Sequence, residues 1–196
     1  MKSIVLVGED ALSCALGARL IAHVLPEWQV PIAPINTGGV TRLRAALPRY
    51  RDQLARQQPV LCIADTDRAC ARTMLDDWLP HGPVDGFMLR LAVSEAEVWV
   101  MADRSGFAKA LGVAVNLVPT APEALPDAKR EVLKLATRST RRAVKEAMVR
   151  ADDPTKPGSG YNLHLCNFVS SSWDPAAAAE RSDSLLRAKR ALARLA

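Results

Sequence analysis

Apolar residues in the first half of the chain follow two alternating spacings. Short runs of consecutive apolar residues, typical of strands buried on both faces, alternate with segments whose apolar residues recur every three or four positions, typical of helices. The runs that predict strands are 3–7, 29–36, 59–64 and 86–93, and the helical segments are 11–25, 40–57, 68–79 and 94–113. The predicted order is therefore β-α-β-α-β-α-β, followed by a further helix.

This order predicts an α/β fold. Right-handed crossovers between successive strands give a parallel sheet with helices on both faces. The prolines in 29–36 favour an edge position for that strand, and Pro48 is expected to kink or restart the helix that contains it.

The second half of the chain has mainly helical spacing. We expect residues 1–113 to form the α/β core and residues 114–196 a helical, basic extension packed on it, the two making one structural unit. A leucine stripe in the last helix is a candidate surface for homo-oligomer formation.

Composition excludes several classes of protein. The chain has 196 residues, 49% of them hydrophobic, and its apolar runs fall well short of the roughly 20 residues needed to cross a bilayer. The N-terminus has no signal-peptide pattern, so we expect a cytoplasmic protein without a membrane partner. The four cysteines form no C-x-x-C pair and the three histidines are scattered, so any bound metal is expected to have oxygen ligands.

Acidic residues follow two of the predicted strands. Glu9 and Asp10 follow the first strand, and Asp65 and Asp67 end the third. Because parallel strands end at one edge of the sheet, these carboxylates meet if the two strands are neighbours. Crowded carboxylates either take up a proton or bind a hard cation. Mg²⁺, or Mn²⁺, needs only one or two of them together with substrate oxygens, so the pattern predicts a metal site.

Helix capping is the alternative role for some of these acids. Asp67 is suitably placed to cap the helix that follows it. Ser94 and Glu97 have the spacing of a capping box. Their helix nevertheless begins at the same sheet edge, so Glu95 or Glu97 can equally add a carboxylate to the site. The spacing leaves both roles open.

Positive charge is concentrated in one segment. Residues 129–150 hold eight Lys or Arg and two Glu, a net charge of +6, so the rest of the chain contributes −1 to the total of +5. A solvated helix face is one explanation and a surface for nucleic-acid phosphates is the other. The candidate nucleic-acid-binding residues are Arg138, Arg141, Arg142, Lys145, Lys156, Tyr161 and Asn162.

The strand ends "VGED" and "ADTD", with the basic C-terminal part, resemble a TOPRIM domain, the metal-binding fold of topoisomerases, primases and some nucleases. Longer stretches, among them "RLAVSEAEVWVMADRSGFAKALGV", "LPDAK", "LATRSTR" and "GSGYNLHLCNFVSSSWDPAAAAERSDSLLRAKRAL", resemble a family of small bacterial TOPRIM-like proteins. Relatives of that family are expected beside ATPase genes in phage-defence loci. The resemblance implies a Mg²⁺-dependent nuclease that works with an ATPase partner.

Carried over residue by residue, the resemblance assigns Asp65 and Asp67 as metal ligands. It assigns Glu9 as the strand-one acid, either a general acid or base or a further metal ligand. The family's E-x-E-x-W segment falls on Glu95, Glu97 and Trp99. The glycine usually found after the first glutamate here precedes it, which leaves open whether Glu9 or Asp10 is the working acid.

Two other functions are compatible with these motifs. A catalytically inactive TOPRIM module would bind nucleic acid or scaffold an ATPase complex. A phosphotransfer receiver also has paired acids after strand one and an aspartate after strand three, but it needs a lysine at the end of a fifth strand, and here the chain becomes helical after residue 93.

Overall fold

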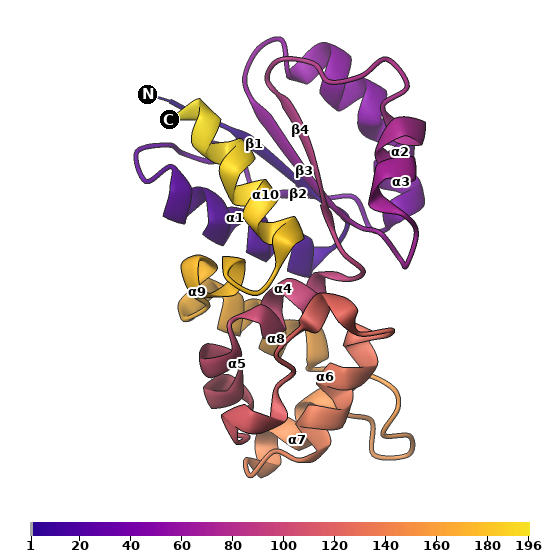
Figure 1. The fold of residues 1–196 in the computed structure, drawn as a ribbon, viewed down its shortest axis with the longest axis vertical. Helices are drawn as coiled ribbons and strands as arrows, with labels where there is room; N and C mark the ends of the chain where they lie inside the picture. Colours follow the sequence, from indigo (N-terminus) through magenta and orange to yellow (C-terminus); the bar gives the residue numbers. More distant parts are fainter. Residues whose placement is uncertain (1) are drawn as a thin grey trace.

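A parallel four-stranded sheet forms one end of the molecule and a group of helices the other (Figure 1). The computed structural model describes residues 2–196. The strands are β1 (Val5–Gly8), β2 (Ile35–Asn36), β3 (Val60–Asp65) and β4 (Phe87–Ala92), in the order β2-β1-β3-β4. All three pairings are parallel. The predicted α/β class and element order are confirmed, and the proline-containing segment does lie at an edge, although only two of its residues form a strand.

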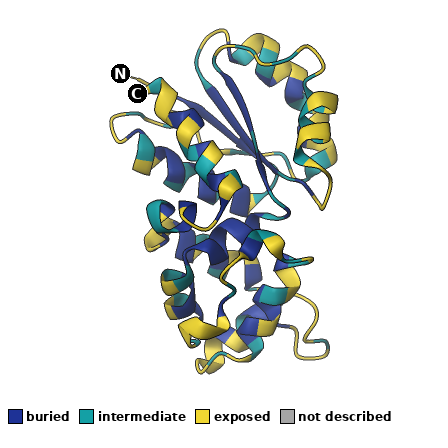
Figure 2. Cartoon of the chain, in the orientation of Figure 1, coloured by how far each residue is buried: buried dark blue, intermediate teal, exposed yellow. Residues whose placement is uncertain are grey.

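Helices cover both faces of the sheet. Side chains alternate along β1, so Leu6 packs with α1 (Ala11–Val24) and Val7 packs with α2 (Val40–Arg49). The helix α3 (Ala71–Trp78) lies beside α2, and the strands between these layers are buried (Figures 1 and 2). Burial on both faces explains the continuous apolar runs of the strands.

Two sequence details shape the helices that flank the sheet. A Cβ atom on Gly17 would lie 2.5 Å from the Leu6 Cδ1 atom, so glycine is needed where α1 crosses the sheet. The helix that contains Pro48 continues into a wider π-helical turn, Tyr50–Leu54. The expected irregularity at this proline is therefore present as a widened turn.

The helical half starts directly after β4. Its helices are α4 (Ala96–Ala102), α5 (Arg104–Leu111), α6 (Ala128–Thr137), α7 (Arg142–Met148), α8 (Tyr161–Ser171), α9 (Pro175–Ala179) and α10 (Asp183–Leu192). The single helix predicted for 94–113 is broken at Asp103. The buried Asp103 carboxylate accepts a hydrogen bond of 3.0 Å from the backbone N–H of Gly106, and in this way Asp103 caps α5. The same carboxylate accepts a second bond of 3.0 Å from the backbone N–H of Asp174.

The two halves share one core. One cluster of buried apolar residues extends from Ile4, before β1, to Leu192, at the end of α10. The helices α4 and α5 lie with the later helices, whereas α10 returns to the sheet (Figure 1). Residue 113, where the predicted α/β core ends, lies just after α5, within the helical half.

Of the helices within residues 2–196, none combines the length and the apolar character needed to span a membrane.

Candidate active site

Two carboxylates meet where β1 and β3 end. The strands are neighbours, with Gly8 paired to Ile63. Glu9 follows Gly8, and its Oε2 atom accepts a hydrogen bond of 3.2 Å from the backbone N–H of Asp65. The predicted meeting of the strand-one and strand-three acids is therefore present in the fold.

A third carboxylate comes from the helix after β4. Glu97 lies in the first turn of α4, is 7% exposed, and accepts a hydrogen bond of 3.0 Å from the Tyr161 hydroxyl. The capping-box prediction for Ser94 and Glu97 is wrong, because α4 begins one residue later than expected, with Glu95 at its N-cap and no side-chain cap. Glu97 instead lies near Asp65, where its charge contributes to the raised pKa of that residue.

We define the acidic cluster as Glu9, Asp65 and Glu97. The carboxyl groups of all three residues have raised pKa values. Burial and the charges of Glu97 and Glu9 raise the pKa of Asp65 to about 9. Burial also raises the pKa values of Glu9 and Glu97. In the absence of a cation, Asp65 therefore carries a proton at neutral pH.

Asp67 lies on an exposed turn beside this cluster. Asp67 and Arg68 both have left-handed backbone conformations, with φ angles of 46° and 69°, and the Asp67 N–H donates to the Ser94 carbonyl at 3.0 Å. The capping alternative for Asp67 is wrong, because α3 begins at Ala71 and its N-cap is Cys70. The charge of Asp67 instead contributes to the raised pKa of Glu9.

Asp10 has a structural role. Its Oδ1 atom accepts hydrogen bonds of 2.8 Å from both the backbone N–H and the hydroxyl of Ser13. Asp10 is therefore the N-cap of α1. Glu9, by contrast, directs its carboxylate to Asp65. Of the two acids that follow β1, Glu9 is therefore the one directed to the end of β3.

The acidic cluster offers the ligand type that a hard cation requires. The Asp65 Oδ1 atom is buried and has no hydrogen-bond partner among residues 2–196, so it is open to a water, a proton or a cation. Within that same range, no three Asp, Glu, His or Cys side chains are arranged to hold one ion together. An ion at this site would be held through one or two carboxylates, as proteins commonly bind Mg²⁺.

Most of the predicted nucleic-acid-binding residues are exposed. Those with exposed side chains are Arg138, Arg141, Arg142, Lys145, Lys156 and Asn162. Some have local partners: Arg142 pairs with Glu146 at 2.7 Å and Lys156 with Asp153 at 3.4 Å. The helix α7, which carries Arg142 and Lys145, lies at the end of the molecule opposite the sheet (Figure 1).

Tyr161 is not available to stack on a nucleotide, so its predicted contact is wrong. It is 2% exposed and directs its hydroxyl to Glu97. Tyr161, Leu165 and Phe168 form the buried stripe of α8. That helical spacing was the sequence signal for a core position.

The sequence motifs missed one basic residue next to the cluster. The backbone N–H of Lys129 donates to Glu95 Oε2 at 2.8 Å, and its ammonium group lies 5.6 Å from the centre of the Tyr161 ring. Its charge lowers the pKa of Glu97 in opposition to burial. The first turn of α6 is thus joined directly to the acidic edge, a name used here for the acidic cluster together with Glu95 at the N-cap of α4.

Comparison of the chain with protein-family models, with curated proteins and with solved structures finds no match.

Proposed function

We propose that the protein is a metal-dependent phosphodiesterase that cleaves nucleic acid, a nuclease of the TOPRIM type. The observation that carries this proposal is the convergence of Glu9, Asp65 and Glu97 from three elements, with a buried Asp65 oxygen that lacks a partner. Ligands of open parallel sheets bind at this edge.

Each residue of the cluster has a role in this proposal. Asp65 and Glu9 would hold Mg²⁺ or Mn²⁺, which when bound polarises a phosphodiester and offsets the charge that develops on its oxygens. Where Asp65 alone holds the ion, Glu9 is instead free to act as a general acid or base, a role that its raised pKa suits. Tyr161 fixes the orientation of Glu97, and exposed Asp67 stands on the side open to substrate.

Water is the nucleophile in this scheme. The chain has two tyrosines, Tyr50 and Tyr161, which are 6% and 2% exposed. Tyr50 packs in the core between the sheet and α2. Neither hydroxyl is free to form the covalent link to nucleic acid that strand passage would require, which favours simple hydrolysis.

The biological setting of the proposal comes from the TOPRIM resemblance. It includes an ATPase partner and a place in phage defence, where the nuclease would act as the effector. The exposed basic residues of α7 and Lys156 would add affinity for the nucleic acid through contacts with phosphates.

A second candidate function is an inactive TOPRIM module that binds nucleic acid or scaffolds an ATPase complex. The favouring observation is that, among residues 2–196, the acids do not form a three-ligand metal group. In this case the proton on Asp65 and the Tyr161 hydrogen bond on Glu97 would satisfy the cluster without a metal.

Nuclease assays separate the two functions. The purified protein is incubated with supercoiled plasmid, linear DNA, single-stranded DNA and RNA in Mg²⁺ or Mn²⁺, beside Asp65→Asn and Glu9→Gln. The matched control is Asp77→Asn, which removes an exposed carboxylate paired with Arg44. We expect cleavage by the wild type and by the control only. Cleavage that persists in Asp65→Asn would overturn the assignment, and no cleavage even with the ATPase present would favour the scaffold.

A further inference from the structure

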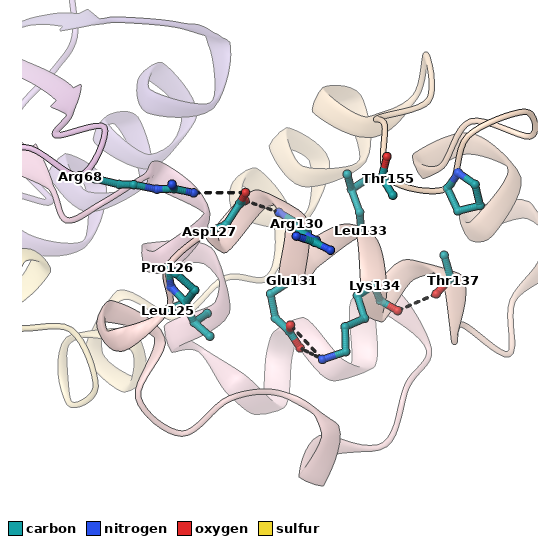
Figure 3. A pocket seen from close by; sticks show the side chains of 11 residues that line it. Arg68, Leu125, Pro126, Asp127, Arg130, Glu131, Leu133, Lys134, Thr137 and Thr155 are labelled. Atoms are coloured by element: carbon teal, nitrogen blue, oxygen red, sulfur yellow. Dashed lines mark hydrogen bonds and ion pairs between the residues drawn. The ribbon is translucent and has the colours of Figure 1, made fainter.

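A cavity lies beside the acidic edge, between the exposed turn that carries Arg68 and the helix α6. It has a volume of about 720 Å³, within the usual range for small-molecule sites. Figure 3 shows its basic side chains, Arg68, Arg130 and Lys134, around Asp127 and Glu131. The rest of the lining consists of four apolar residues and two threonines, namely Leu125, Pro126, Leu133, Pro154, Thr137 and Thr155.

The charges of this cavity leave one cation without a partner. Arg68 pairs with Asp127 at 3.3 Å, and Lys134 pairs with Glu131 at 3.1 Å. No carboxylate within residues 2–196 forms an ion pair with the exposed guanidinium of Arg130. The cavity therefore has a net charge of +1, located on a group that binds phosphate oxygens in a bidentate manner.

The walls of the cavity are fixed to the acidic edge. Arg68 directly follows Asp67, and its ion pair with Asp127 joins that turn to the N-cap of α6. Asp127 also accepts a hydrogen bond of 2.7 Å from the Arg130 backbone N–H. One residue before Arg130, Lys129 donates its N–H to Glu95 of the acidic edge.

We propose that this cavity is the substrate-strand subsite of the nuclease, where Arg130 binds a phosphate and the apolar lining packs against the attached sugar and base. The inference rests on the proposed nucleic-acid substrate. A strand seated here continues past Arg68 to Asp67 and the acidic cluster. The ligand is thus a nucleoside phosphate unit of a single strand, and the helix α7, which carries Arg142 and Lys145, lies beyond α6 toward the end of the molecule opposite the sheet (Figure 1).

Binding without cleavage tests this inference. A fluorescein-labelled twelve-residue oligothymidylate is titrated in EDTA by fluorescence anisotropy, with wild type, Arg130→Gln and the matched control Arg187→Gln. Arg187 is an exposed arginine of α10 that already pairs with Asp183 at 2.9 Å. Thymidine 5′-monophosphate is added as a competitor, and the thermal midpoint of each variant is measured to verify the fold.

We expect Arg130→Gln to weaken binding about tenfold, as for the loss of a charged hydrogen-bonded contact, and Arg187→Gln less than twofold. The slope of log affinity against log salt should fall by about 0.7 in Arg130→Gln, as for one lost phosphate contact on a single strand. The mononucleotide should displace the oligonucleotide from the wild type.

Equal affinities of the two arginine variants, or no binding by the wild type, would overturn the subsite. Asp65→Asn keeps the two proposals apart, since it should bind the oligonucleotide as tightly as the wild type and fail to cleave it. A nuclease whose binding is indifferent to Arg130 would refute the subsite alone. Binding that depends on Arg130 in a protein without nuclease activity would refute cleavage alone.

Discussion

Asp65→Asn is expected to stabilise the protein at neutral pH. Asp65 is a half-buried residue with a buried Oδ1 atom, and burial together with the charges of Glu97 and Glu9 raises its pKa from 3.8 to about 9. In the folded state without metal it is therefore protonated at pH 7, whereas in the unfolded chain it is ionised. Asparagine has nearly the same shape and is neutral in both states, so it avoids the free-energy cost of taking up that proton.

The cost follows from proton linkage. At pH 7 the unfolded carboxyl lies about three pH units above its pKa, and each unit corresponds to about 1.4 kcal/mol, so protonation on folding costs on the order of 4 kcal/mol. The folded state binds more protons than the unfolded state between the two pKa values. The free energy of unfolding of the wild type therefore falls as pH rises from 4 toward 9, and at pH 4.5 the advantage of the variant shrinks to about 1 kcal/mol.

Urea denaturation in EDTA at pH 4.5 and pH 7 measures this difference for wild type, Asp65→Asn and Asp67→Asn. Asp67 is exposed, so its variant should stay within about 0.5 kcal/mol of the wild type at both pH values. A pH-independent difference between Asp65→Asn and wild type, or a variant less stable at pH 7, would refute the account of a protonated acidic cluster.

Three further substitutions test the surroundings of the site. Tyr161→Phe removes the hydroxyl that donates a hydrogen bond to Glu97, and urea denaturation should show a loss of about 1–2 kcal/mol of stability. Because this hydrogen bond lowers the pKa of Glu97, the variant should also raise that pKa further, which carboxyl NMR titration can follow. Asp10→Ala removes the cap of α1 and should cost about 1 kcal/mol while nuclease activity is retained; loss of activity in a folded variant would reassign the working acid of strand one. Gly17→Ala would place a Cβ 2.5 Å from Leu6 Cδ1 and should lower stability by about 1–3 kcal/mol, whereas an unchanged thermal midpoint would contradict the close packing of α1 on the sheet.

The hydrophobic pattern was sufficient to predict the sheet. Strands buried on both faces leave continuous apolar runs, so the element order followed from the sequence. The meeting of Glu9 with Asp65 was predicted only on condition that the first and third strands are neighbours, which the sheet order shows. The apolar spacing did not predict the break at Asp103. This residue caps α5 locally through the Gly106 N–H, and it also accepts a hydrogen bond from Asp174, a residue 71 positions away.

The same limit applies to the site. The roles of Glu97 and Tyr161 were ambiguous because capping and core packing share their sequence spacing with catalysis and nucleotide stacking. Their contact joins residues 64 positions apart, so it appears only in the folded chain. The pairing of Arg68 with Asp127, which helps to form the cavity, is also long-range and has no local sequence pattern.

Metal binding measured by calorimetry with proton counting tests the central claim most directly. Mn²⁺ is titrated at pH 7 into wild type and Asp65→Asn in buffers with different ionisation enthalpies. Because Asp65 must lose its proton to become a ligand, the wild type should bind one Mn²⁺ and release about one proton per ion. Asp65→Asn should bind far more weakly and release none. Equal affinity in the two proteins, or binding by the wild type without proton release, would contradict a metal site built on Asp65.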